Sequence, residues 1–155
     1  MRILTRTLLG AVVVVSVVSE ITRPANTEAP MLAGARVPAD VRSTIDRSCR
    51  DCHSQSTRYP WYTHIPPVSW LIDSDVKHGR ERLNFSKWSE YSVIRRERFL
   101  SEIANQVQDR GMPLAVYTLM HRDARLSDRD IEAVFAWTQT ERARLIAESA
   151  VRNSR

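Results

Sequence analysis

Two cysteines and one histidine form a motif whose spacing specifies a chemistry. The chain contains only two cysteines, and both lie in Cys49-Arg50-Asp51-Cys52-His53. Residues i, i+3 and i+4 of a helix share one face, so Cys49, Cys52 and His53 would project together. Two thiols placed this way can each form a thioether with a haem vinyl group, while the adjacent imidazole binds the iron. The motif therefore predicts one covalently attached haem c, with His53 as the proximal iron ligand.

Three other uses of the cysteine pair have less support in the sequence. A structural zinc site would need two further ligands, and the remaining histidines, His64, His78 and His121, show no His-x₃₋₅-His spacing. A thioredoxin-like redox pair would need a βαβ pattern, which the chain lacks. A disulfide across two intervening residues would close a very small loop and add little stability.

The second axial ligand decides what a bound haem can do, and the sequence offers several candidates. Methionine and histidine are the usual choices, and methionine raises the reduction potential. Met112 stands between Gly111 and Pro113, so its thioether would come from a stiffened loop after a helix. We expect Met112 as the distal ligand, with Met120 and His121 as the alternatives. An iron without a sixth protein ligand would instead be open to small molecules.

The chain that must position these residues begins with a predicted export segment at residues 1–19. Arg2 and Arg6 precede an apolar run over residues 8–18, and a cleavage position follows at residues 17–19. The run is shorter than the ~18–20 residues of a comfortable transmembrane helix, which favours a cleaved signal peptide. An uncleaved anchor that starts at Ile3 stays open. Both outcomes predict a periplasmic protein, either soluble or tethered to the inner membrane.

The rest of the chain predicts one all-α, cytochrome c-like domain at residues 38–147, wrapped round the haem. About four helices are expected, on apolar periods of three or four residues, at residues 38–52, 68–83, 90–109 and 127–147. Ile94 should face inward, Gly111 should end the third helix, and Asp130 should complete a capping box with Ser127. Residues 20–37 predict a linker without fixed structure, and residues 148–155 a frayed tail.

Aromatic and basic residues add expectations about the surroundings of the haem. Four aromatic side chains are expected either to wall the haem or to fill the core: Trp61, Tyr62, Trp70 and Trp88. Three arginines are candidates to pair with a haem propionate: Arg58, Arg80 and Arg82. The formal net charge is +5, but acids and bases are interleaved without a basic stripe, which argues against a nucleic-acid partner.

Several stretches of the chain resemble the bacterial haem-binding domain family of c-type cytochromes. They are Cys-Arg-Asp-Cys-His-Ser-Gln-Ser-Thr-Arg-Tyr-Pro-Trp-Tyr, Pro-Pro-Val-Ser-Trp-Leu, Asp-Val-Lys-His-Gly-Arg, Leu-Asn-Phe-Ser-Lys-Trp, Gly-Met-Pro, Tyr-Thr-Leu-Met-His and Arg-Leu-Ser, within about residues 38–138. The resemblance implies a periplasmic or membrane-tethered monohaem protein, with His53 as ligand and Met112 as its natural partner. Where the family often reads Met-Pro-Pro, this chain has Met112-Pro113-Leu114.

These features predict an electron carrier rather than an enzyme, with redox proteins as its partners. The alternative is a haem-based sensor or ligand-binding protein, which would need an open or displaceable sixth position on the iron. A haem enzyme such as a peroxidase ranks last, because the sequence does not single out distal acid–base residues.

Overall fold

The computed structural model describes residues 6, 10–11, 13–14, 23–27 and 29–154. Within this part of the chain every regular element is helical, as predicted. No helix among these residues is long and apolar enough to cross a membrane. The expected export segment at residues 1–19 lies largely outside the described residues.

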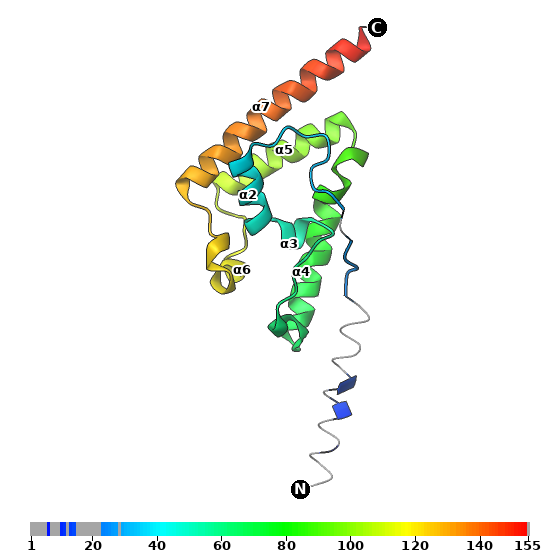
Figure 1. The fold of residues 1–155 in the computed structure, drawn as a ribbon, viewed down its shortest axis with the longest axis vertical. Helices are drawn as coiled ribbons and strands as arrows, with labels where there is room; N and C mark the ends of the chain where they lie inside the picture. Colours follow the sequence, from blue (N-terminus) through cyan, green and yellow to red (C-terminus); the bar gives the residue numbers. More distant parts are fainter. Residues whose placement is uncertain (1–5, 7–9, 12, 15–22, 28, 155) are drawn as a thin grey trace.

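Six α-helices and three short 3₁₀ helices follow one another along the described chain (Figure 1). The α-helices are α2 (Ala39–Ser48), α3 (Arg50–His53), α4 (Val68–Arg82), α5 (Val93–Gln108), α6 (Ala115–Met120) and α7 (Asp128–Asn153). The 3₁₀ helices are η1 (Trp61–His64), η2 (Phe85–Glu90) and η3 (Arg122–Ala124). The predicted helix at residues 68–83 is confirmed almost to the residue, whereas α6 and η3 lie where the sequence predicted a loop.

The main hydrophobic core lies where α2, α5 and α7 meet. Ile45 of α2, Leu100 of α5 and Trp137 of α7 are buried there, together with Trp88 of η2. Burial of each such side chain contributes roughly 1.5–3 kcal/mol to the free energy of folding. This core therefore fixes α2, and with it the chain that leads into the cysteine motif.

The last helix begins as predicted and continues further than predicted. The Ser127 hydroxyl accepts a hydrogen bond from the Asp130 backbone N–H, and the Asp130 carboxylate accepts one from the Ser127 N–H. The predicted tail at residues 148–155 is wrong, because α7 runs on to Asn153. Arg144 stabilises this extension by pairing with Glu148 one turn later and with the buried Glu141 one turn earlier.

The prediction of a linker without fixed structure at residues 20–37 also needs correction, because the described part of this segment is packed against the domain. We call residues 23–27 and 29–37 the N-terminal strap. Leu32 is buried in the core, and its backbone N–H donates to the Phe85 carbonyl at 2.9 Å. The Asn26 amide donates to the Thr57 carbonyl at 2.7 Å. Individual backbone and side-chain contacts hold the strap, which is why it shows no apolar periodicity.

The boundaries of α5 differ from the prediction at both ends. The helix begins after Ser92, whose hydroxyl accepts from the Arg95 N–H, rather than at the predicted residue 90. It ends at Gln108, and the residue with positive φ is Arg110 (φ 53°) rather than Gly111. Ile94, expected to face inward, is 82% exposed, whereas its neighbour Val93 packs against the core.

Candidate functional site

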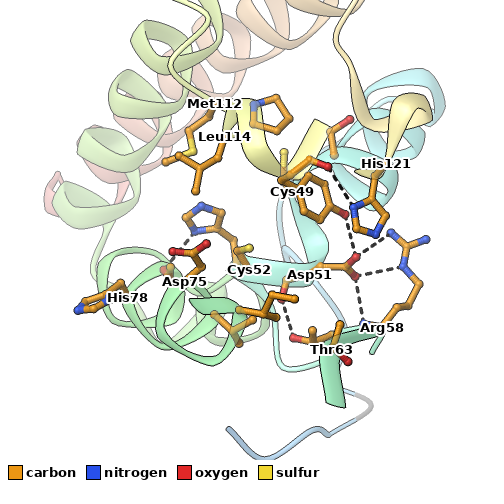
Figure 2. Close-up of a pocket in the computed structure, with 18 of the residues that line it drawn as sticks. Cys49, Asp51, Cys52, Arg58, Thr63, Asp75, His78, Met112, Leu114 and His121 are labelled. Atoms are coloured by element: carbon orange, nitrogen blue, oxygen red, sulfur yellow. Dashed lines mark hydrogen bonds and ion pairs between the residues drawn. The ribbon is translucent and has the colours of Figure 1, made fainter. Parts of the chain in front are cut away.

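One pocket gathers the side chains that the sequence singled out. Cys49, Cys52, His53 and Met112 all line it, and the space not filled by atoms is about 1090 Å³, part of it open to solvent. Figure 2 shows Met112 on one side of the pocket and Cys52 on the other. Within the described residues no three His, Cys, Asp or Glu side chains are placed to hold a metal ion.

The cysteine motif sits on a helix that breaks at its first cysteine. The expected helix over residues 38–52 divides into α2 and α3 at Cys49, whose φ of −126° and ψ of −28° are not helical. The His53 N–H still donates to the Cys49 carbonyl at 3.0 Å, so the four-residue spacing of the motif is kept. Burial raises the pKa of Cys49 to about 12 and that of Cys52 to about 11, so both are neutral thiols at pH 7.

His53 is held by one ring nitrogen and leaves the other available. Its Nδ1 lies 3.1 Å from the Gly79 carbonyl oxygen and 3.0 Å from that of Leu83. Because a carbonyl only accepts, Nδ1 carries the proton and Nε2 keeps its lone pair. Burial lowers the pKa of His53, which also favours the neutral ring. A backbone partner on one nitrogen and a free lone pair on the other is the usual arrangement of a metal-binding histidine.

Gly79 allows α4 to approach the motif this closely. A Cβ atom on this residue would lie 2.5 Å from the Cys52 carbonyl oxygen, which is shorter than any real contact of this kind. The role of Gly79 follows from the packing of α3 on α4, for which the sequence gives no signal.

The segment after α5 supplies the opposite wall of the pocket. The Met112 N–H donates to the Gln106 carbonyl at 3.3 Å, and the Gly111 N–H donates to the same oxygen at 2.9 Å. These bonds tie the Gly111–Met112 turn back to the end of α5. Met112 and Leu114 both line the pocket.

The two alternative distal ligands are placed differently from Met112. Met120 is 60% exposed and lies outside the residues that line the pocket. His121 does line the pocket, but its Nδ1 donates to the Tyr117 carbonyl at 3.1 Å. Its Nε2 therefore accepts from the Tyr62 hydroxyl at 2.9 Å. Both nitrogens of His121 are engaged, so the arrangement favours Met112.

A buried carboxylate inside the motif connects three parts of the pocket. Asp51 accepts hydrogen bonds from the backbone N–H and the Nε of Arg58, both at 3.1 Å, and from the Tyr117 hydroxyl at 2.8 Å. Burial and the Asp51 charge raise the pKa of Tyr117 well above its usual value, so the phenol stays protonated. Sequence reasoning missed Asp51 because it occupies a variable position between the two cysteines.

The three candidate arginines have different partners. Arg58 is paired with Asp51. Arg80 donates to the Ser54 carbonyl at 2.7 Å and to the Thr57 hydroxyl at 3.0 Å, so it braces the protein itself. Arg82 lines the pocket and is exposed. Asp75 is a further polar group of the pocket that the sequence did not indicate, and partial burial raises its pKa.

The four aromatic side chains do not form one group. Trp88 is fully buried in the core, as one of the two expectations had it, and Tyr62 lines the pocket. Trp61 and Trp70 satisfy neither, because they are 76% and 53% exposed. Both belong to the end of the molecule formed by η1 and the start of α4, two elements that contact each other (Figure 1).

Comparisons with known proteins point to the same cofactor as the motif. The model of a family described as "Haem-binding domain" matches residues 8–140. The chain is 27% identical over 107 residues to cytochrome c peroxidase Ccp of Escherichia coli (strain K12). This match covers 67% of the chain and 23% of that relative, so the chain spans about a quarter of the relative's length. The search of solved structures found no match.

Proposed function

The chain belongs to the haem-binding domain family, and from this premise we propose that it is an electron-transfer protein with one covalent haem c. Cys49 and Cys52 would form the two thioethers, His53 would be the proximal iron ligand and Met112 the distal one. The observation that carries the proposal is the free Nε2 of His53 in a pocket that Met112 lines as well. Imidazole nitrogen and thioether sulfur are both established ligands of haem iron.

The residues of the pocket fit what an electron carrier requires. Bound haem supplies a reversible one-electron couple. The backbone bonds of His53 keep the ring orientation and the tautomer fixed while the charge of the site changes. The soft thioether of Met112 favours the reduced state and so a higher potential. Arg82, at the pocket and exposed, is the arginine best placed to pair with a propionate.

The proposal includes an exported location and protein partners. The basic residues and apolar run of residues 1–19 support export to the periplasm, with the segment either cleaved or kept as an anchor. Haem c proteins that carry electrons act between other redox proteins, so the partners are expected to be such proteins. A reporter that is active only outside the cytoplasm, fused after residue 37, should be active, and a cytoplasmic signal would contradict export.

The distal ligand tests the proposed function most directly. Met112→Ala should lower the reduction potential, remove the sulfur-to-iron charge-transfer band of the oxidised protein and let the reduced protein bind carbon monoxide. The matched control is Met120→Ala, which removes an exposed thioether a few residues away and should change none of these. If wild-type protein already binds carbon monoxide readily, the sixth position is open and the sensor alternative replaces electron transfer.

Peroxide reduction is a second candidate, because the curated relative is a cytochrome c peroxidase. In this chain Tyr117 and His121 line the pocket and could serve as polar groups near a bound peroxide. Peroxidase turnover requires an iron position that hydrogen peroxide can reach. Rapid oxidation of the reduced wild-type protein by hydrogen peroxide, with turnover in the presence of an electron donor, would favour this candidate over electron transfer.

A further inference from the structure

The end of the molecule formed by η1 and the start of α4 exposes an unusual number of large apolar side chains. We call these five residues the apolar tip: Trp61, Ile65, Val68, Trp70 and Leu71. Trp61 is 76% and Leu71 66% exposed. The five residues lie within eleven positions of the chain, on η1, on α4 and on the short link between these two contacting elements. Large exposed apolar side chains gathered this closely indicate a contact site rather than ordinary exposure.

The local packing shows that the domain does not use these side chains for its own core. Thr63 and Ser69, small polar residues of the same two helices, are buried while the neighbouring tryptophans point outward. The Thr63 hydroxyl donates to the Pro60 carbonyl at 2.6 Å, which closes η1 on itself. The tip therefore has a defined backbone structure in which small polar side chains are buried and large apolar side chains are exposed. This is the reverse of the usual arrangement in a surface helix.

The N-terminal chain reaches the domain at this tip. Arg23 donates to the Thr63 carbonyl at 2.7 Å and pairs with Asp73 at 3.3 Å. Its guanidinium carbon also lies 4.3 Å from the centre of the Tyr59 ring. Five residue steps separate Arg23 from the end of the apolar run at residue 18, and five extended residues span at most about 18 Å. If that run is embedded in a bilayer, the tip must lie close to the same bilayer surface.

The chemistry of the tip matches a phospholipid surface. Residues 59–72 contain two tryptophans, both in the tip, and no Asp or Glu, and the next residue, Asp73, is paired with Arg23. Tryptophan and tyrosine are enriched at the level of the lipid headgroups, where an apolar ring and a polar edge are both satisfied. The absence of carboxylates in this stretch avoids repulsion by anionic lipids.

We propose that the apolar tip inserts into the headgroup region of the membrane that holds the N-terminal segment. This inference rests on the exported location proposed above and on an uncleaved anchor. Tyr62 and Thr63 of η1 also line the pocket, so insertion of the tip would fix the orientation of the pocket relative to the membrane surface. A partner protein bound to the same membrane would then approach the pocket from a constant direction.

Lipid cross-linking in isolated membranes tests the proposal on the full-length holoprotein. A benzophenone amino acid is placed at Trp61 or Leu71, and at Ile94 of α5 as the matched control. Ile94 is an apolar residue that is 82% exposed, and its helix α5 lies away from the start of α4 (Figure 1). After illumination, mass spectrometry should find several-fold more phospholipid adducts at the two tip positions than at the control. All three proteins should show the same haem spectrum, because the substituted side chains are exposed.

Three outcomes would overturn the proposal. Equal lipid adducts at the tip and at Ile94 would show non-specific contact with the membrane. Adducts of the tip with a second copy of this chain or with another protein would identify a protein interface instead. Release of the chain from the membrane fraction without lipid adducts would show that the N-terminal segment does not anchor it. None of these outcomes bears on haem attachment, which the spectrum reports separately.

Discussion

At the scale of single residues, the pocket depends on contacts that are only partly visible in the sequence. Cys49, Cys52 and His53 could be predicted to lie together because their spacing is local and repeats with the helix. Met112 could be nominated from its glycine and proline neighbours. The sequence already favoured it over Met120, and the structure adds that Met120 is 60% exposed on α6. Asp51 and Gly79 could not be found in advance, because their roles come from chain segments far away in the sequence.

Gly79 provides a sharp test of the close approach between α3 and α4. Alanine is the better helix former by about 1 kcal/mol, but in Gly79→Ala the new methyl would meet the Cys52 backbone oxygen at 2.5 Å. We expect this overpacking to lower the free energy of unfolding by ~1–3 kcal/mol and to shift the haem absorbance, because His53 is held by the same helix.

The control for this variant is Gly111→Ala. A Cβ at Gly111 would come too close only to the terminal oxygen of the Gln106 side chain, at 2.6 Å, and this side chain can move. Denaturant unfolding and the absorbance spectrum of both holoproteins provide the comparison. Equal stability of the two variants would show that α4 can shift without cost and that Gly79 does not position His53.

Tyr117 tests whether the Asp51 carboxylate holds α6 over the pocket. The Tyr117→Phe variant keeps the ring but removes the hydroxyl that donates to Asp51 at 2.8 Å. A hydrogen bond to a charged group contributes ~1.5–3 kcal/mol, and we expect a loss of stability in that range. Hydrogen exchange at residues 115–121 should become faster than in Val116→Ala, a control at an exposed position of the same helix. Unchanged exchange in Tyr117→Phe would mean that other contacts hold α6.

At the scale of elements, helices with strong signals were predictable and contact-dependent segments were not. The helix at residues 68–82 and the capping box at Ser127 follow from periodicity and from local hydrogen bonds. The N-terminal strap has neither signal, and Leu32 is ordered because of its bond to Phe85 in a distant part of the chain. The short helix α6 was missed for a related reason, because six residues are too few to show an amphipathic period.

Asp130 connects the start of α7 to α2, and this connection should depend on pH. Partial burial disfavours its charge, but hydrogen bonds from Arg47, Ser127 and Thr44 outweigh that cost and hold the pKa of Asp130 well below its usual range. Because the pKa is lower in the folded state than the ~3.9 of an unfolded chain, the stabilisation is complete above pH ~5. It is lost as the pH falls through the folded-state value.

We therefore expect Asp130→Asn to lower the free energy of unfolding at pH 7 by ~1–2 kcal/mol, and the difference from wild type to shrink below pH ~4. The control is Asp128→Asn, in the same first turn, where the carboxylate is 93% exposed and pairs with Arg110 on the surface. Thermal unfolding across this pH range is the measurement. A difference between Asp130→Asn and wild type that stays constant with pH would contradict the assignment.

At the scale of the whole molecule, the hydrophobic core and the pocket occupy different places. The core lies between α2, α5 and α7, and α5 and α7 pack along each other without contributing to the pocket. The pocket lies between α3, α4 and the segment from Met112 to His121. A sequence that predicts a haem at the centre of the helices suggests that the whole fold depends on the cofactor. The observed division instead predicts that the elements around the pocket depend on the haem much more than α5 and α7 do.

Removing the covalent attachment tests this division. In wild type the haem should remain with the chain on a denaturing gel, whereas acid–acetone should extract it from Cys49→Ala with Cys52→Ala. After extraction, hydrogen exchange should accelerate by roughly tenfold or more in α3 and α6, because they lose the group that they enclose. In α5 and α7 the Phe99 and Trp137 contacts remain, so the exchange rates there should stay within about threefold of wild type. Equal acceleration in all helices would show that the haem supports the entire fold and that the core between α2, α5 and α7 is not independently stable.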